Sequence, residues 1–475
     1  MLSLLTVIND VVTRTLVLAL MNYLEAVQYI QSFPDSERDS HGSRSLTMSV
    51  ETMRALLNRL GNPQNGRHTI HITGSKGKGS TCMMVGSILK EAGIRTASYT
   101  SPHLHSYNER IAIDLEPISD ELFVRGLTEI KPAIEAELAA KSGYISTFGI
   151  LTALFFHITR NIQPPIDWQI VEVGLGGKYD ATNVFDTKDM VIVTPISLEH
   201  TEVLGVSQSE IAANKAGIIT PGCTTVLSAQ KDASVRNVIG RQCHMVDATL
   251  IDINSRPFKL KSHSHELSGQ TFTIESPLGS LDLELSLLGA HQITNAVTAA
   301  MACKALAQKG VSISDENIAD GLADATINGR FEVMPASSRN GAPPSPTVVL
   351  DGAHNHESAA ALASALKALF KTNKCIFVVG VNNDKNINAI WRELRPLSKT
   401  VISTRSQSMR AMDPKQIADA VSFQSDPLSA ATNSVPEAIK LAFDSAEPDD
   451  IVCITGSLYV VAEAREYLLS EQAKH

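Results

Sequence analysis

A short run of glycine, lysine and serine has the composition of a phosphate-binding loop. It follows the apolar stretch HTIHIT, precedes a helical pattern, and comprises Gly74, Ser75, Lys76, Gly77, Lys78, Gly79 and Ser80. Glycines let backbone N–H groups approach phosphate oxygens, the start of a helix favours anions, and Lys78 adds a positive charge. The spacing departs from the strict G-x-x-x-x-G-K-[ST] pattern, and a dinucleotide-binding pattern fails at Cys82. The run favours nucleotide binding over a bland glycine-rich turn.

Three further residues stand out by their positions, and two of them, Glu172 and His200, have side chains that can bind a divalent cation. Glu172 ends the apolar run DWQIVE before a glycine turn, which is where a parallel strand would present a carboxylate to Mg²⁺. His200 ends TPISLEH, and Ser101 begins a Ser-Pro turn. Taken alone, each has a structural alternative: a solvated acid, a satisfied histidine and an ordinary turn.

The elements that must position these residues alternate between apolar strands and amphipathic helices. Strand-like runs include HTIHIT, DWQIVEVG, DMVIVTP, TVVLDG, CIFVVGV and DIVCITG. Such alternation predicts an α/β protein with mostly parallel sheets. Between Phe258 and Leu287 the pattern changes to short period-two pieces, which predicts a small antiparallel β insertion.

The chain is long enough for two domains. At 475 residues it exceeds the usual length of one domain, and the segment from Ala323 to Pro346 is rich in turn-forming residues. We therefore expect a P-loop-type domain over residues 1–326, in which residues 1–20 are an extension, and a Rossmann-like α/β domain over residues 327–475. The hinge is expected between Ile327 and Arg330.

Composition excludes several classes of protein. Hydrophobic residues make up 43% of the chain and charged residues 19%, as in ordinary globular enzymes. The net charge of −9 argues against binding to nucleic acid, because no general basic field exists. Six scattered cysteines form neither a zinc-binding pattern nor a disulfide framework, which indicates a reducing, cytoplasmic setting.

The first twenty residues resemble a targeting segment only superficially. Asp10 and Arg14 interrupt the apolar run, and no small-residue cleavage site follows. The run is also too short and broken to span a bilayer. A docked helix or a simple extension is therefore favoured over targeting, and no membrane association is expected.

The motifs together resemble the folylpolyglutamate and dihydrofolate synthases of the Mur ligase superfamily. IHITGSKGKGST is similar to the family's IHVAGTNGKGST, and the resemblance continues through SPHL, NERI, VEVGLGGKYDATN and NKAGIITPG from Met21 to nearly the last residues. It implies two Mg²⁺ ions held by Ser101, Glu172, His200 and Lys215. Lys215 is implied to be carbamylated, since a carbamate can bind Mg²⁺ whereas an ammonium cannot.

The resemblance also assigns residues to the nucleotide and the substrates. Gln292, Asn295, Arg330, Asp351 and His354 match nucleotide-binding positions. The substrate positions implied are Ser146, Thr147, Phe148, Tyr179, Asp180, Ala181, Asp384, Lys385, Ser457 and Tyr459. The family's usual Glu is replaced by Gly149, and its usual Asp before the histidine by Glu199.

The implied reaction is ATP-dependent amide ligation. The γ-phosphoryl group of ATP activates a carboxylate of dihydropteroate or a folate as an acyl-phosphate, which the amine of L-glutamate then attacks. Lys78, His200, Lys215 and Arg330 are the expected catalytic residues, and positioning and charge neutralisation drive the step. Two alternatives remain open: a Mur-type ligase acting on a cell-wall precursor, and a nucleotide-binding switch without ligase chemistry. A monomer is expected.

Overall fold

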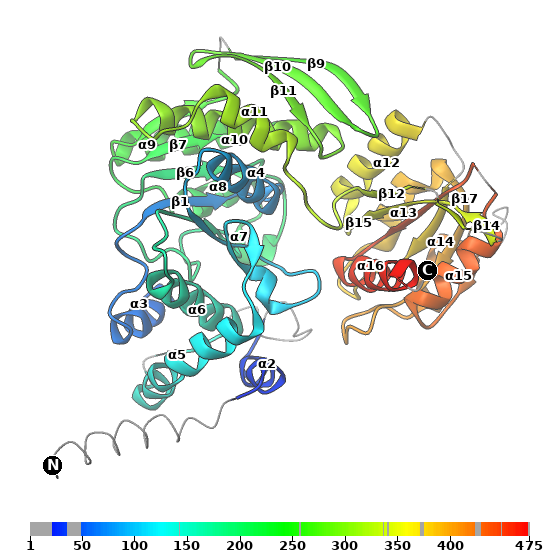
Figure 1. Cartoon of the computed structure of the whole chain (residues 1–475), viewed down its shortest axis with the longest axis horizontal. Coiled ribbons are helices and arrows are strands. Elements are labelled where there is room, and N and C mark those ends of the chain that lie inside the picture. Colours follow the sequence, from blue (N-terminus) through cyan, green and yellow to red (C-terminus); the bar gives the residue numbers. More distant parts are fainter. Residues whose placement is uncertain are drawn as a thin grey trace.

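The protein folds around two separate parallel-rich sheets (Figure 1). The computed structural model describes residues 21–35, 49–141, 143–255, 258–335, 337–339, 342–370, 375–422, 429–447 and 449–473. The expected extension at residues 1–20 lies outside these ranges. No helix within them is long and apolar enough to cross a membrane.

The first sheet has eight strands, and their pairing positions the phosphate loop. Their spatial order is β4 (Glu116–Pro117), β3 (Ile111–Ile113), β2 (Thr96–Tyr99), β5 (Trp168–Glu172), β1 (His68–Thr73), β6 (Met190–Val193), β7 (Thr224–Leu227) and β8 (Thr249–Asp252). The six neighbouring strands β2, β5, β1, β6, β7 and β8 pair in parallel. By contrast, β3 pairs antiparallel with both β2 and β4. Since Ile72 of β1 pairs with Glu172 of β5, the two strands end at the same edge of the sheet.

Helices cover both faces of this sheet. They are α2 (Tyr23–Gln31), α3 (Val50–Arg59), α4 (Lys78–Glu91), α5 (Asp120–Ala140), α6 (Thr147–Asn161), α7 (Thr201–Leu204), α8 (Gln208–Ala216), α9 (Ala233–Met245), α10 (Ala290–Gln308) and α11 (Asp315–Ala323), with a 3₁₀ turn η2 (Tyr107–Arg110). Ile88 of α4 belongs to the same apolar cluster as Ile70 and as Ala299 of α10, whereas Phe155 of α6 packs in a second cluster. The sheet is thus buried on both faces, as its continuous apolar strands predict.

A three-stranded antiparallel sheet inserts before α10. Its order is β11 (Gly279–Leu285), β10 (Gly269–Ser276) and β9 (Lys259–Glu266). Phe272, Ile274, Leu283 and Leu285 alternate with partly or fully exposed residues and are buried in the main core. The period-two pattern therefore predicted this insertion correctly.

The second sheet has six strands. Their order is β12 (Glu332–Met334), β15 (Thr347–Asp351), β19 (Ile451–Thr455), β16 (Cys375–Val379), β17 (Ser398–Ser403) and β18 (Ser429–Ala431), of which only β12 is antiparallel to its neighbour. A short hairpin is formed by β13 (Ser337–Arg339) and β14 (Ala342–Ser345). The helices are α12 (His356–Phe370), α13 (Ile387–Leu394), α14 (Pro414–Val421), α15 (Val435–Ser445) and α16 (Leu458–Ala473), with a 3₁₀ turn η3 (Arg395–Leu397). The predicted fold class, two mostly parallel α/β units with an antiparallel insertion, is confirmed.

Close packing of α4 against α11 depends on a glycine. A Cβ atom at Gly321 would lie 2.5 Å from the backbone Cα of Ile88. We expect Gly321→Ala to force the two helices apart and to lower the free energy of unfolding by about 1–3 kcal/mol. Gly240→Ala in α9 is the matched control, since its Cβ would only meet Leu250 at 3.7 Å. That control should gain about 0.4–1 kcal/mol. Thermal midpoints shifting in the same direction would contradict this packing.

Candidate active site

The phosphate loop joins β1 to α4 and is shaped by two close approaches. Gly74 has φ +146° and Gly77 has φ +84°, both in the region that favours glycine. A Cβ atom at Gly74 would overlap Thr194, and one at Gly77 would overlap the side chain of Asn295. Asn295 of α10 in turn donates to Gln292 Oε1 at 2.9 Å, and both residues are buried. The loop, Gln292 and Asn295 are therefore brought together, although more than 200 residues separate them.

Only part of the loop has backbone donors left for a ligand. The N–H groups of Ser75 and Lys76 both donate to the carbonyl of Pro195, at 2.9 and 3.2 Å. In the first turn of α4, by contrast, N–H groups have no intrahelical acceptor, and no side chain caps the helix at Gly77. The available anion site is therefore the N-terminus of α4, from Lys78 to Ser80, rather than the whole loop.

Glu172 and Ser101 meet beside this helix end. Glu172 is buried, and its Oε2 atom accepts the backbone N–H of Ser101 at 3.0 Å. The same carboxylate oxygen lies 3.6 Å from the Cβ position of Gly79, in the first turn of α4. A carboxylate this close to a phosphate-binding helix fits a role in holding Mg²⁺ next to a nucleotide. Within the described ranges, no three His, Cys, Asp or Glu side chains form a metal cluster by themselves.

Lys215 lies beneath the loop as a buried amine. Its Nζ atom donates to the carbonyl of Gly74 at 2.8 Å and to Glu199 Oε1 at 3.2 Å. Burial lowers the pKa of Lys215 to about 8, even though Glu199 opposes the shift. Burial works against ionisation of Glu199, yet Lys215 and two loop lysines hold its pKa below the ordinary value. Lys76 Nζ lies 3.9 Å from Glu199 Oε2.

The remaining residues of the first half lie around the loop. Lys78 Nζ folds back to the carbonyl of Gly74 at 3.2 Å. His200 begins α7 in the left-handed conformation, with φ +46°, and is exposed. Because Glu199 directly precedes His200, the bonds of Lys215 to Gly74 and Glu199 connect the phosphate loop to the segment that carries His200.

Asp351, Arg330 and His354 come from the second half of the chain, at or next to strands of its sheet. Asp351 ends β15, and its carboxylate accepts the N–H groups of Phe331 and Ala353, both at 2.9 Å. Burial raises the pKa of Asp351, while Arg330 acts against that rise. Burial lowers the pKa of His354 to about 4, so its ring is neutral at pH 7, and Nδ1 donates to the carbonyl of Gly352. Its Nε2 atom is then left as an acceptor.

Charged groups of the two halves face each other. Burial lowers the pKa of Lys76, and this loop lysine also feels the charges of Glu357 and Lys385 from the second half. Lys385 pairs with Asp384 at 2.8 Å, and Arg410 pairs with the other oxygen of Asp384 at 3.1 Å. Arg410 was missed by sequence reasoning, because TRSQSMR carries no motif and only the fold brings it to Asp384.

Three of the expected substrate residues lie where α6 begins, and two of them make hydrogen bonds within the fold. Ser146 caps α6 through the N–H of Gly149, and the hydroxyl of Thr147 donates to the carbonyls of Ile30 and Phe33. Phe148 instead packs its ring against Gly174, with Tyr99 at 5.7 Å between ring centroids.

The loop that follows Glu172 is organised by Asp180. This carboxylate is buried and accepts the N–H groups of Leu175 and Thr182, both at 2.9 Å. Burial raises the pKa of Asp180, and these hydrogen bonds oppose the rise. Tyr179 is 61% exposed, whereas Ala181 is buried. Of these neighbours, Tyr179 is therefore the accessible one.

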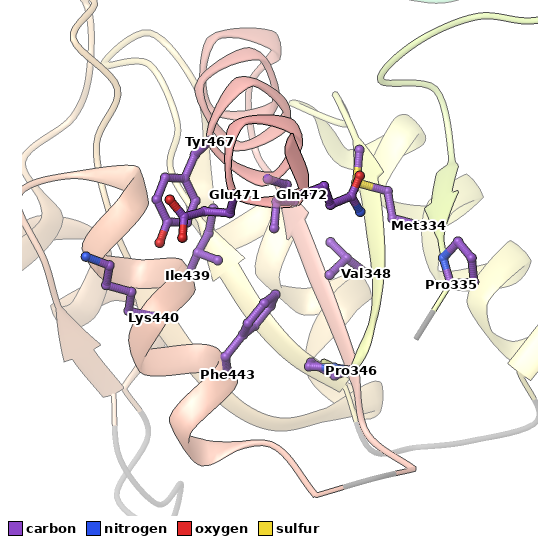
Figure 2. A pocket seen from close by; sticks show the side chains of 11 residues that line it. Met334, Pro335, Pro346, Val348, Ile439, Lys440, Phe443, Tyr467, Glu471 and Gln472 are labelled. Atoms are coloured by element: carbon purple, nitrogen blue, oxygen red, sulfur yellow. The ribbon is translucent and has the colours of Figure 1, made fainter. Parts of the chain in front are cut away.

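Ser457 and Tyr459 lie where α16 begins. The hydroxyl of Ser457 accepts the N–H of Val460 at 3.2 Å and is buried, while Tyr459 is half-buried. A pocket of the same half lies elsewhere (Figure 2): it is lined by Met334, Pro346, Val348, Phe443 and Tyr467. Because Val348 lies near the start of β15 and Asp351 ends it, the pocket is at the opposite end of the sheet from the candidate site.

Both halves of the chain match domains of the Mur ligases. Residues 133–303 match the Mur ligase middle domain and residues 329–458 match the Mur ligase glutamate ligase domain. A dihydrofolate synthase/folylpolyglutamate synthase of Mycobacterium tuberculosis is 33% identical over 448 residues, covering 88% of this chain and 89% of that protein. The chain belongs to the dihydrofolate synthase/folylpolyglutamate synthase family, whose members are ATP-dependent ligases.

Solved structures of that family share the whole fold. Mycobacterium tuberculosis folylpolyglutamate synthase complexed with ADP and AMPPCP is 30% identical, with a TM-score of 0.80 and coverage of 94% of this chain and 98% of that one. Escherichia coli FolC in complex with DHPP and ADP is 25% identical, with a TM-score of 0.78 and coverage of 94% and 98%. The family resemblance inferred from the motifs is confirmed.

The role of Asp180 can be tested by removing its carboxylate. Asp180→Ala leaves two buried N–H groups without acceptors, and we expect it to lower stability by about 1–3 kcal/mol for each. Asp186→Ala is the control, because its side chain is 87% exposed and its ion pair with Arg54 should contribute little. If thermal midpoints of the two variants coincide while only Asp180→Ala loses activity, Asp180 contacts substrate instead.

Proposed function

We propose that this chain joins L-glutamate to the carboxylate of dihydropteroate or a folate, using ATP and an acyl-phosphate intermediate. The observation that carries the proposal is the convergence of the α4 N-terminus, Glu172 and Lys215 in the first half, opposite the charged residues of the second half. The names of the relatives support glutamate ligation in folate metabolism. The proposal takes residues 1–326 and 327–475 as the two domains of a cytoplasmic monomer.

The chain's own residues would act by positioning and neutralising charge. The first turn of α4 and Lys78 bind the β- and γ-phosphates, and Arg330 and His354 approach from the second half. The residues that would hold Mg²⁺ are Glu172, Ser101, His200 and a carbamylated Lys215. When bound, Mg²⁺ supplies charge neutralisation on the phosphates. No enzyme nucleophile is required, because phosphorylation itself converts the substrate carboxylate into an acyl-phosphate, which the amine of glutamate can attack.

Lys215 has the environment that carbamylation requires. Carbon dioxide reacts with a neutral amine, and a pKa of about 8 leaves a useful neutral fraction near neutral pH. As an ammonium, Lys215 cannot approach a cation. As a carbamate it would carry negative charge next to the loop, on the side where Glu199 now accepts a hydrogen bond from the ammonium.

The acceptor is the less defined substrate. FolC of Escherichia coli is in complex with DHPP, which supports a pteridine-bearing acceptor. Here Phe148 offers an aromatic face beside Gly174, at the start of the loop after Glu172. Gly149, which replaces the family's usual Glu, is buried at the start of α6, so its position offers no polar side chain to the acceptor.

Phosphate release tests the reaction directly. We expect release to require ATP, glutamate and either dihydropteroate or a tetrahydrofolate, and Lys78→Ala to reduce it by at least about 100-fold, since charge stabilisation is lost. A Mur-type ligase of cell-wall precursors would be inactive with both pteridine acceptors. ATP hydrolysis that ignores both glutamate and acceptor would instead indicate a nucleotide-binding switch.

The carbamate predicts a dependence on pH and carbon dioxide. At a fixed carbon dioxide concentration, labelling of Lys215 by ¹³C-carbon dioxide should rise as pH increases through about 8, because the neutral amine becomes the major form. Lys215→Arg should show no carbamate signal in ¹³C NMR and should lose activity by about 100-fold or more. Lys309→Arg, at an exposed lysine after α10, should leave both measurements unchanged. Full activity of Lys215→Arg would refute carbamylation.

A further inference from the structure

One loop connects the proposed metal carboxylate to the second half of the protein. At its start, the backbone N–H of Ser101 donates to Glu172 at 3.0 Å. Three residues later, the half-buried side chain of Leu104 packs against the apolar cluster of the second half, which includes Val460 and Val461. Leu104 also lies 3.5 Å from the Cβ position of Gly329, next to Arg330. The loop thus contacts both halves within four residues.

A single carboxylate fixes the conformation of this loop. Glu109 accepts three consecutive backbone N–H groups, from Leu104 at 2.7 Å, His105 at 2.8 Å and Ser106 at 2.9 Å. Hydrogen bonds to an ionised carboxylate are stronger than those between neutral groups. Together, the three hydrogen bonds restrict rotation of the backbone at Leu104. The side chain of Leu104 is therefore held toward the second half.

Leu104 makes its contact where the second half must be placed accurately. Gly329 precedes Arg330, and Val461 lies one turn after Ser457 at the start of α16. Leu104 and Val461 both approach the Cβ position of Gly329, so this contact adjoins residues proposed to face the nucleotide or the glutamate. Misplacement of reacting groups by about 1 Å can cost roughly 100-fold in rate. A packed leucine at this point limits such misplacement.

We propose that Leu104 is a positioning residue that holds the second half in register with Glu172, and that Glu109 acts through it by fixing the loop. The inference rests on the proposed ligase function, because it concerns how the two halves are aligned for that reaction. The contact of Leu104 is with the second half, whereas the helix end proposed to bind the phosphates belongs to the first. Removal of Leu104 should therefore affect the step that needs both halves more than nucleotide binding by the first half alone.

The decisive comparison is Leu104→Ala with Leu138→Ala. Leu138 lies on α5 and is 43% exposed, so its truncation removes the same atoms at a site without the interdomain contact. We expect Leu104→Ala to reduce kcat for glutamate-dependent phosphate release by about tenfold or more and to raise KM for glutamate. The Kd for ADP should stay within about twofold of the wild-type value, because binding to α4 is retained. Leu104→Met should restore most of kcat, since it returns the apolar volume.

Glu109→Gln provides a second, independent variant. It should reproduce the kcat loss of Leu104→Ala, and the double variant should be no worse than the more impaired single one, because both changes disrupt one connection. Equal kcat values for Leu104→Ala and Leu138→Ala would overturn the inference. So would a double variant whose losses simply multiply.

Hydrogen exchange separates this inference from the proposed function. In the wild-type protein, addition of AMPPCP with Mg²⁺ should slow amide exchange in residues 326–332, and Leu104→Ala should abolish that protection while Leu138→Ala retains it. Protection that persists in Leu104→Ala would overturn the inference whatever the reaction. A wild-type protein that protects this segment but releases no phosphate with glutamate would instead count against the ligase function alone.

Discussion

The parallel pairing of β1 with β5 is the constraint on which the site depends. With Ile72 opposite Glu172, the phosphate loop and the buried carboxylate leave the sheet at one edge and within a few ångströms of each other. Parallel strands carry their loops to a common edge, which is where ligands bind in open α/β sheets. A change of one residue in this register would turn Glu172 to the opposite face of the sheet.

Burial then gives these groups their chemistry. Lys215 is a buried cation whose partners are a loop carbonyl and Glu199, so its charged form is only partly compensated and its pKa falls to about 8. Around it, Glu199 remains ionised because several lysines surround it. The same desolvation that makes a charge costly also makes electrostatic interactions in the site stronger. The site is therefore prepared for anionic phosphates before any ligand is present.

The two halves supply different parts of the reaction, which makes their alignment a structural problem. The first half carries the phosphate loop and Glu172, and the second carries Asp351 and His354. Contacts such as Leu104 against the apolar cluster of the second half join the halves by packing, whereas the like charges of Lys76 and Lys385 repel each other. Packing is short-ranged and depends on complementary shapes, so it fixes the position of one half relative to the other. Charge interactions act over longer distances and favour closure around an anion.

The sequence by itself determined the fold class, the antiparallel insertion, the phosphate loop and the family, because these depend on local periodicity and on contiguous motifs. Tertiary structure decided what individual side chains do. The amides of Ser75 and Lys76 are occupied by Pro195, and the carboxylate of Asp180 is occupied by its own loop. Arg410 reaches Asp384 although no motif marks it. These hydrogen bonds and ion pairs depend on distances of about 3 Å between segments that are distant in the chain or folded back on themselves. Local sequence patterns do not set such distances, because a hydrogen bond is made or lost within a few tenths of an ångström.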